Sequence, residues 1–388
     1  MTGPIYLAIP LVTHRPWDTT VAVWGLGLTL ALQGFIENAV SVFTAVHRLE
    51  HEFQARLVEK VVLVSAGFAA LGLGGGLLGL VAAFALAGVA SFVFATRRIH
   101  QRLAPLHRWW RPAEARQLAR DLAPVAQAQF LTVATSRLAP ITLALLAGDM
   151  AAGHFGAAFR VYDVTWVAVL SLEAAIYPEL ARTAADSPRF RALTRQAFDA
   201  LLLVALPVAL GLAVGADWLT PLVYGKGYGP TAPALAVLGT AIGCAMLWHF
   251  LAMVLLAVDQ PRRLRTIAAL AFATGLVAIP SLVRSGEALG AAVAVLLVES
   301  VTLAASVGAV VGLIGWPFGR GAAKGLMAAA AGGIVAGLLP AGAGRLGGAL
   351  LTYAVALAVL RPVPGAMCLR LLRGALGRPG PPSPAGIG

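Results

Sequence analysis

The chain has 388 residues, of which 59% are hydrophobic and only 12% are charged, and its formal net charge is +12. Because a water-soluble protein of this length needs a far more polar exterior, the composition excludes an ordinary soluble domain and predicts an integral membrane protein. The basic residues stand in short clusters between apolar runs, without a nucleic-acid module or a nucleotide-binding Gly-rich motif, so neither nucleic acid nor nucleotide is an expected partner.

Apolar stretches of about 20 residues recur along the whole chain, and each is long enough to cross the hydrocarbon core of a bilayer as a helix. We therefore expect an all-α, polytopic transmembrane helical bundle of about eleven spans. In chain order the expected spans are 18–46, 58–74, 76–96, 121–147, 152–181, 197–223, 230–257, 264–283, 288–314, 322–341 and 345–372.

The loops between these spans differ sharply in charge. One set of alternate loops holds 23 of the 29 Lys and Arg residues, whereas the other set holds four. Since cytoplasmic loops hold the excess of Lys and Arg, the basic loops and the C-terminus are expected on the cytoplasmic side of the cell's inner membrane.

The spans and loops divide the chain into six expected parts. These are the remnant of a truncated helix with an outer loop (1–17), a partial N-terminal helical lobe (18–96), a basic cytoplasmic connector (97–120), a C-terminal helical lobe (121–314), two additional helices (315–376) and a Gly/Pro-rich disordered tail (377–388). The connector could lie on the inner leaflet as an amphipathic segment or could be a solvated loop.

Three stretches share the pattern of one transporter family. Residues Gly153–Arg182 begin with a Gly-aromatic-Ala pattern and end on Tyr-Pro-Glu-Leu, Tyr224–Leu238 is a Tyr-Gly loop followed by Tyr, Ala-Pro and Leu, and Ala257–Arg265 is a basic loop after a long helix. In these stretches the chain resembles the oligosaccharide flippases, or polysaccharide biosynthesis membrane proteins. They are a branch of the superfamily that also holds lipid II flippases and multidrug exporters.

The resemblance implies a bundle of two lobes around a central cavity, in which a polyprenyl-pyrophosphate-linked glycan is turned over by alternating access. Matched to the family, the first full span, 18–46, resembles the family's fourth helix. The first three helices are therefore expected to be absent, and the N-terminal lobe to be incomplete.

A charged side chain within hydrocarbon is costly, so each one in a span needs a physical reason. Arg137 lies within the span 121–147, and Gln129, Thr132 and Ser136 share its side of the helix. The first interpretation is a cationic, hydrogen-bonding wall that binds a pyrophosphate through the guanidinium group. The alternative is that Arg137 extends to the outer headgroups or pairs with a neighbouring carboxylate.

Acidic residues within the spans are candidates for coupling transport to an ion or proton. Asp163 stands three residues after Arg160, so the two can either bind and orient substrate or neutralise each other as a structural pair. Glu173 and Glu299 could each serve as a proton site, or could be paired core residues. Glu37 has the same two interpretations.

The function expected from this pattern is translocation of a lipid-linked anionic glycan across the membrane for cell-surface polysaccharide biosynthesis. No covalent step, catalytic residue, metal ion or cofactor is expected, and the partners are the glycan lipid and membrane lipids. The alternatives are a multidrug or metabolite exporter of the same superfamily, a truncated non-functional remnant and, less favoured because the outer loops are short, a membrane-embedded glycan polymerase or ligase.

Overall fold

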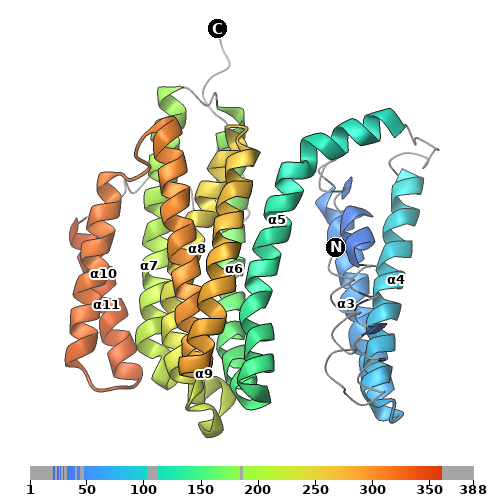
Figure 1. Ribbon diagram of the computed structural model, residues 1–388, viewed down its shortest axis with the longest axis horizontal. Helices are drawn as coiled ribbons and strands as arrows, with labels where there is room; N and C mark the ends of the chain where they lie inside the picture. Colours follow the sequence, from blue (N-terminus) through green and yellow to red (C-terminus); the bar gives the residue numbers. More distant parts are fainter. Residues whose placement is uncertain are drawn as a thin grey trace. The chain divides into compact units, whose positions relative to one another are not determined.

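The protein is all-helical wherever its structure, a computed structural model, is described. The described residues are 21, 24, 25, 27, 29, 33–39, 42–43, 48–102, 112–183 and 187–360. In chain order the helices are α3 (Leu49–Gly72), α4 (Gly76–Arg102), α5 (Pro112–Leu146), α6 (Gly148–Arg182), α7 (Pro188–Tyr224), the short 3-10 helix η1 (Lys226–Tyr228), α8 (Thr231–Ala257), α9 (Pro261–Ile314), α10 (Arg320–Leu338) and α11 (Ala343–Leu360) (Figure 1).

The chain is a multi-pass membrane protein, as the composition predicts. Among the described residues, seven helices are long and apolar enough to cross a membrane, and the longest of them, Pro261–Ile314, contains two of the expected spans. The expected span 152–181 lies within α6, and the expected span 58–74 lies in α3 except for its last two residues, which are in the following turn. Parts of the expected connector, 97–120, are helical, because α4 continues to Arg102 and α5 begins at Pro112, and its residues 103–111 lie outside the described residues.

The chain divides into two compact units, Met1–Arg116 and Gln117–Gly388. In the first unit, α3 and α4 pack side by side and are joined by a tight turn in which Gly74 and Gly76 have positive φ angles of 74° and 52°. The fully buried Ser91 of α4 donates a hydrogen bond to the Ala55 carbonyl of α3, at 3.1 Å. Small residues at this contact allow the two helices to approach closely.

The second unit is built around α8, which packs against α6, α7 and α9. Its core includes the fully buried rings of Phe198 and Phe250, whose centroids are 6.2 Å apart. Gly239 of α8 lies so close to α7 that an added Cβ would be 2.5 Å from the Cβ of Leu212. The absence of a side chain at Gly239 therefore sets the distance between these two helices.

Helix α9 is a helical hairpin rather than one continuous rod (Figure 1). Its backbone leaves the helical conformation at Glu287, where φ is 46° and ψ is −124°. The two arms run antiparallel, and Arg263 near the start of the first arm donates a hydrogen bond to the Ala309 carbonyl near the end of the second. This break confirms the boundary expected between the spans 264–283 and 288–314.

The hairpin of α10 and α11 lies beside α7 (Figure 1), and polar contacts join the two. The buried carboxylate of Asp199 on α7 accepts hydrogen bonds from the backbone N–H groups of Gly319, Gly321 and Ala322, at 2.9, 3.0 and 3.1 Å. Because these groups form the N-terminus of α10, an aspartate of one helix caps another. The Tyr353 hydroxyl of α11 also donates to the Leu203 carbonyl of α7, at 2.8 Å.

Candidate functional site

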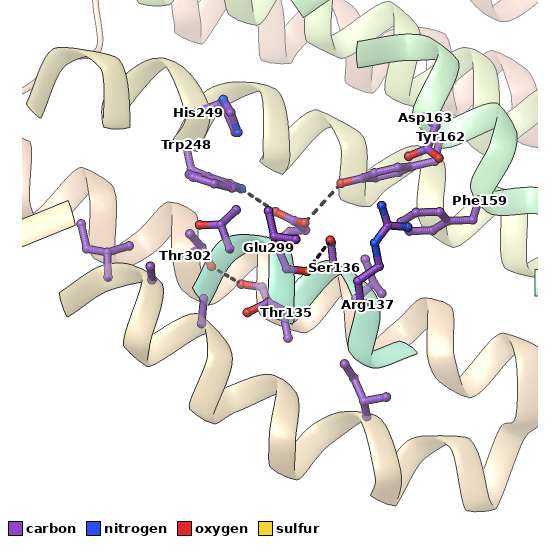
Figure 2. A pocket seen from close by; sticks show the side chains of 18 of the residues that line it. Thr135, Ser136, Arg137, Phe159, Tyr162, Asp163, Trp248, His249, Glu299 and Thr302 are labelled. Carbon is purple, nitrogen blue, oxygen red and sulfur yellow. Dashed lines mark hydrogen bonds between the residues drawn. The ribbon is translucent and has the colours of Figure 1, made fainter. Parts of the chain in front are cut away.

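A cavity of about 240 Å³ lies inside the second unit, between α5, α6, α8 and the two arms of α9 (Figure 2). Every residue that lines it belongs to a membrane-spanning segment expected from the sequence. One part of its wall is apolar, and the other is polar and comes mainly from α5, α6, α8 and the second arm of α9. A polar cavity among membrane helices is the usual position of a transporter's binding site.

The carboxylate of Glu299 is held from two sides at the centre of the polar wall. The Tyr162 hydroxyl of α6 donates to its Oε1 atom at 3.2 Å, and the Trp248 indole N–H of α8 donates to its Oε2 atom. Figure 2 shows both rings aimed at the carboxylate. Because burial of an unbonded carboxylate is costly, these two donors are what allow Glu299 to occupy this position.

The α5 side of the cavity presents hydroxyl groups. Thr132 and Ser136 line the cavity, and their hydroxyls donate within their own helix, to the carbonyls of Ala128 at 3.0 Å and Val133 at 2.8 Å. A hydroxyl that donates to its own backbone still has lone pairs, so it can accept a hydrogen bond from a ligand.

Arg137 brings a cation to the same wall. In Figure 2 its side chain extends from α5 towards Phe159 and Asp163 of α6. Asp163 also lines the cavity and is close enough to Arg137 and Arg160 for electrostatic interaction. Within the described part of the chain, Arg137 forms no ion pair, so its forked guanidinium donors remain able to bind an anion.

An aromatic stack closes the α6 side. The rings of Phe155 and Phe159 are stacked with centroids 5.5 Å apart, and those of Phe159 and Tyr162 with centroids 5.0 Å apart. Stacking along α6 fixes the orientation of Tyr162, whose hydroxyl contacts Glu299. The aromatic stack thus ends in Tyr162, whose hydroxyl donates to the Glu299 carboxylate.

Of the residues predicted for the site, five line one cavity: Arg137, Thr132, Ser136, Asp163 and Glu299. Gln129 is exposed and does not line the cavity, although Thr132, three residues further along α5, does. Arg160 is also exposed and outside it, since it is turned by about 100° from Phe159 on the α6 surface.

Two further predictions concern acidic residues of α6. Arg160 and Asp163 form no ion pair among the described residues, but Arg160 is close enough to Asp163 for electrostatic interaction, so both interpretations of the pair stay predictions. Glu173 belongs to α6, but its side chain lies outside the described residues, so its suggested role stays a prediction.

Sequence reasoning missed several cavity residues. Tyr162, Trp248 and His249 all line the cavity and were not proposed from the sequence as site residues. A signal was available for Trp248, because it lies well inside its span, away from the interfacial positions that tryptophan favours. A tryptophan at such a depth needs a hydrogen-bond acceptor for its indole N–H.

The cavity offers no metal site of the usual kind. In the described ranges, no three His, Cys, Asp or Glu side chains come together as the ligands of a metal ion would. The groups that the cavity presents are a guanidinium cation, hydroxyl acceptors, aromatic surfaces and a carboxylate held by two donors.

Comparison with known proteins gives one family match and a structural likeness. The family described as "Polysaccharide biosynthesis protein" matches residues 18–233, which include the α5 and α6 walls of the cavity. The solved structure "Lipid II flippase MurJ, inward closed conformation" has a TM-score of 0.66 over 95% of this chain and 82% of that chain, at 9% sequence identity. At this identity the likeness shows the fold alone. No curated protein sequence matches the chain.

Proposed function

Because this chain belongs to the polysaccharide biosynthesis protein family, we propose that it moves a polyprenyl-pyrophosphate-linked oligosaccharide across the cytoplasmic membrane, for assembly of a cell-surface polysaccharide. The observation on which the proposal rests is Arg137 on the wall of a cavity between membrane helices. A cation within hydrocarbon is costly, and an anionic ligand that it binds offsets this cost.

The chemical match is between the cavity wall and a pyrophosphate that links a glycan to a lipid. Arg137 can bind two oxygens of one phosphate through its forked N–H donors. Thr132 and Ser136, one turn apart on the same helix, can accept hydrogen bonds from sugar hydroxyls. The polyprenyl chain needs no polar site, since the lipid around the helices accepts it.

The mechanism that we propose has no covalent step. The cavity lowers the free energy of the charged headgroup inside the membrane, and a change in the arrangement of the helices exposes the headgroup to the other side. Asp163 and Glu299 are the proposed coupling groups, because each is a carboxylate on the cavity wall. The protein acts as a transporter and not as an enzyme.

The test is turnover of a fluorescent polyprenyl-pyrophosphate-linked oligosaccharide in vesicles containing purified protein. We expect Arg137→Ala to slow turnover by about tenfold or more, as expected for loss of a charged hydrogen bond, and Arg137→Lys to restore part of the rate. Arg191→Ala, which removes an exposed arginine of α7 outside the cavity, is the matched control and should turn over at the wild-type rate.

Two outcomes would contradict the proposal. One is turnover by Arg137→Ala equal to that of Arg191→Ala, which would remove the cavity cation from the mechanism. The other is wild-type protein that moves a cationic drug in the same vesicles but leaves the lipid-linked glycan where it was, which would identify an exporter.

A further inference from the structure

A second cavity, of about 470 Å³, lies in the first unit, between α3 and the C-terminal end of α4. Its polar part is formed by Arg97, Arg98 and Gln101. These residues occupy the last turns of the candidate span Gly76–Gln101, where a membrane helix reaches the lipid headgroups. The function proposed above makes no use of this cavity.

The rest of the cavity wall is apolar and lies deeper along the same helix. Ala90, Val93 and Phe94 of α4 form it together with Val58 of α3. Ala90 and Gln101 are eleven residues apart, so the wall runs about 16 Å along the helix axis, from an apolar end to a cationic one. This order matches a phospholipid, whose charged headgroup lies at the membrane surface above its acyl chains.

The two arginines are placed to bind a phosphate. The Arg98 guanidinium lies over the Phe94 ring, 5.3 Å from its centroid, and this contact orients the side chain. In the described part of the chain neither Arg97 nor Arg98 forms an ion pair, whereas the acidic neighbour of Val58, Glu59, is paired with Lys60 at 2.8 Å. The mouth of the cavity therefore keeps its positive charge.

The walls of this cavity are firmly placed. One turn away from it, Ser91 donates to the Ala55 carbonyl, and Ala55 and Ala95 are fully buried at the contact of α3 with α4. A pocket between two helices that are joined in this way exists before any ligand binds, so binding has little ordering cost to overcome.

We propose that this cavity binds one anionic phospholipid of the surrounding bilayer, with its phosphate between Arg97 and Arg98 and one acyl chain along Ala90, Val93 and Phe94. Basic pockets between membrane helices bind anionic lipid headgroups in this way. A free phosphate ion would satisfy the arginines but would leave the apolar wall without a partner. The ligand class is thus a phosphodiester with an attached hydrocarbon chain.

The experiment is native mass spectrometry of the full chain in detergent, titrated with phosphatidylglycerol or with zwitterionic phosphatidylcholine. We expect the wild type to bind one phosphatidylglycerol about tenfold more tightly than phosphatidylcholine, because two arginines favour the net negative headgroup. The double variant Arg97→Gln/Arg98→Gln should lose this preference. The control Arg116→Gln/Arg120→Gln removes the same amount of charge from two exposed positions of α5. This control should keep the preference for phosphatidylglycerol.

A second variant tests the apolar part without changing any charge. Ala90→Trp places a bulky ring at the apolar end of the cavity but keeps both arginines, and we expect it to lose bound phosphatidylglycerol while it melts at the wild-type temperature. Millimolar inorganic phosphate should leave the lipid bound. The proposal would be overturned by equal binding of the two lipids, by retention of phosphatidylglycerol in Ala90→Trp, or by its displacement with inorganic phosphate, which would identify a free-anion site.

Discussion

At the scale of single residues, Glu299 shows how the cavity is organised. Its two carboxylate oxygens are bound by side chains from two other helices, Tyr162 of α6 and Trp248 of α8. A carboxylate held in this way links the helices around the cavity, so we expect its hydrogen bonds to contribute to stability and, if it is a coupling group as proposed, its charge to affect transport. The two effects can be separated by substitutions that alter either a donor or the carboxylate itself.

We expect Trp248→Phe to destabilise the protein by about 1–3 kcal/mol, because it leaves one oxygen of a cavity carboxylate without its donor. The measurement is the thermal unfolding midpoint of the detergent-solubilised protein. The matched control is Trp218→Phe, since Trp218 is 36% exposed near the end of α7. Equal decreases in the two variants would mean that the hydrogen bond to Glu299 contributes nothing.

The Glu299→Gln variant removes the charge but keeps a carbonyl oxygen that can accept from either donor. If Glu299 takes part in coupling, turnover in vesicles should fall while the unfolding midpoint changes little. Glu287→Gln, at the exposed turn of the α9 hairpin, changes the same side chain outside the cavity and should keep full turnover. A Glu299→Gln protein as active as Glu287→Gln would exclude a coupling role for this carboxylate.

The sequence predicts part of the site because of a simple energetic rule. Arg137, Asp163 and Glu299 could be found because a charge within an apolar run is costly and requires a reason. The contacts of Tyr162 and Trp248 with Glu299 could not be predicted, because they join residues 137 and 51 positions apart. Such contacts depend on how helices pack, which a single sequence does not show.

At the scale of helices, the connection between α7 and the α10–α11 hairpin depends strongly on one side chain. Asp199 accepts three backbone hydrogen bonds from the start of α10. Close packing adds to this contact, since a Cβ on Gly319 would overlap the Asp199 carboxylate. The negative charge of the Asp199 carboxylate also interacts favourably with the partial positive charge at the N-terminus of α10.

We expect Asp199→Ala to destabilise the protein by about 1–2 kcal/mol, as loss of a helix cap commonly does, and to expose α10–α11 to protease. Limited proteolysis followed by mass spectrometry would detect earlier cleavage between α9 and α10. Asp217→Ala is the control, because the Asp217 carboxylate is largely exposed and its distance to Arg345 is 3.9 Å. The interpretation fails if both variants resist protease like the wild type.

Helix boundaries show where sequence patterns are sufficient. The boundary expected between the spans 264–283 and 288–314 lies at Glu287 in the structure, where the close approach of Gly290 to Leu282 leaves no room for a Cβ. Helices α4 and α5 extend beyond the expected spans 76–96 and 121–147, because the arginines and alanines outside the apolar runs favour a helix as well as a loop. Hydropathy therefore locates the membrane-spanning part of a helix better than it locates the ends of that helix.

For the molecule as a whole, the charge asymmetry predicts which ends of the helices face the cytoplasm. In a background without Cys244 and Cys368, Gly227→Cys lies in the turn before α8 and Asp259→Cys in the turn after it. A membrane-impermeant maleimide should label Gly227→Cys in intact cells, and Asp259→Cys only after the membrane is permeabilised. Labelling of both positions from outside would contradict the predicted orientation.

The central claim is that the headgroup of a lipid-linked glycan occupies the cavity beside Arg137. A photoreactive amino acid in place of Ser136 on the cavity wall would test it most directly, with Val277 as control. Val277 belongs to the first arm of α9, is 74% exposed and does not line the cavity. On illumination of native membranes, we expect the glycan lipid to crosslink at Ser136 and not at Val277. Equal crosslinking at both positions, or none at Ser136, would contradict the account.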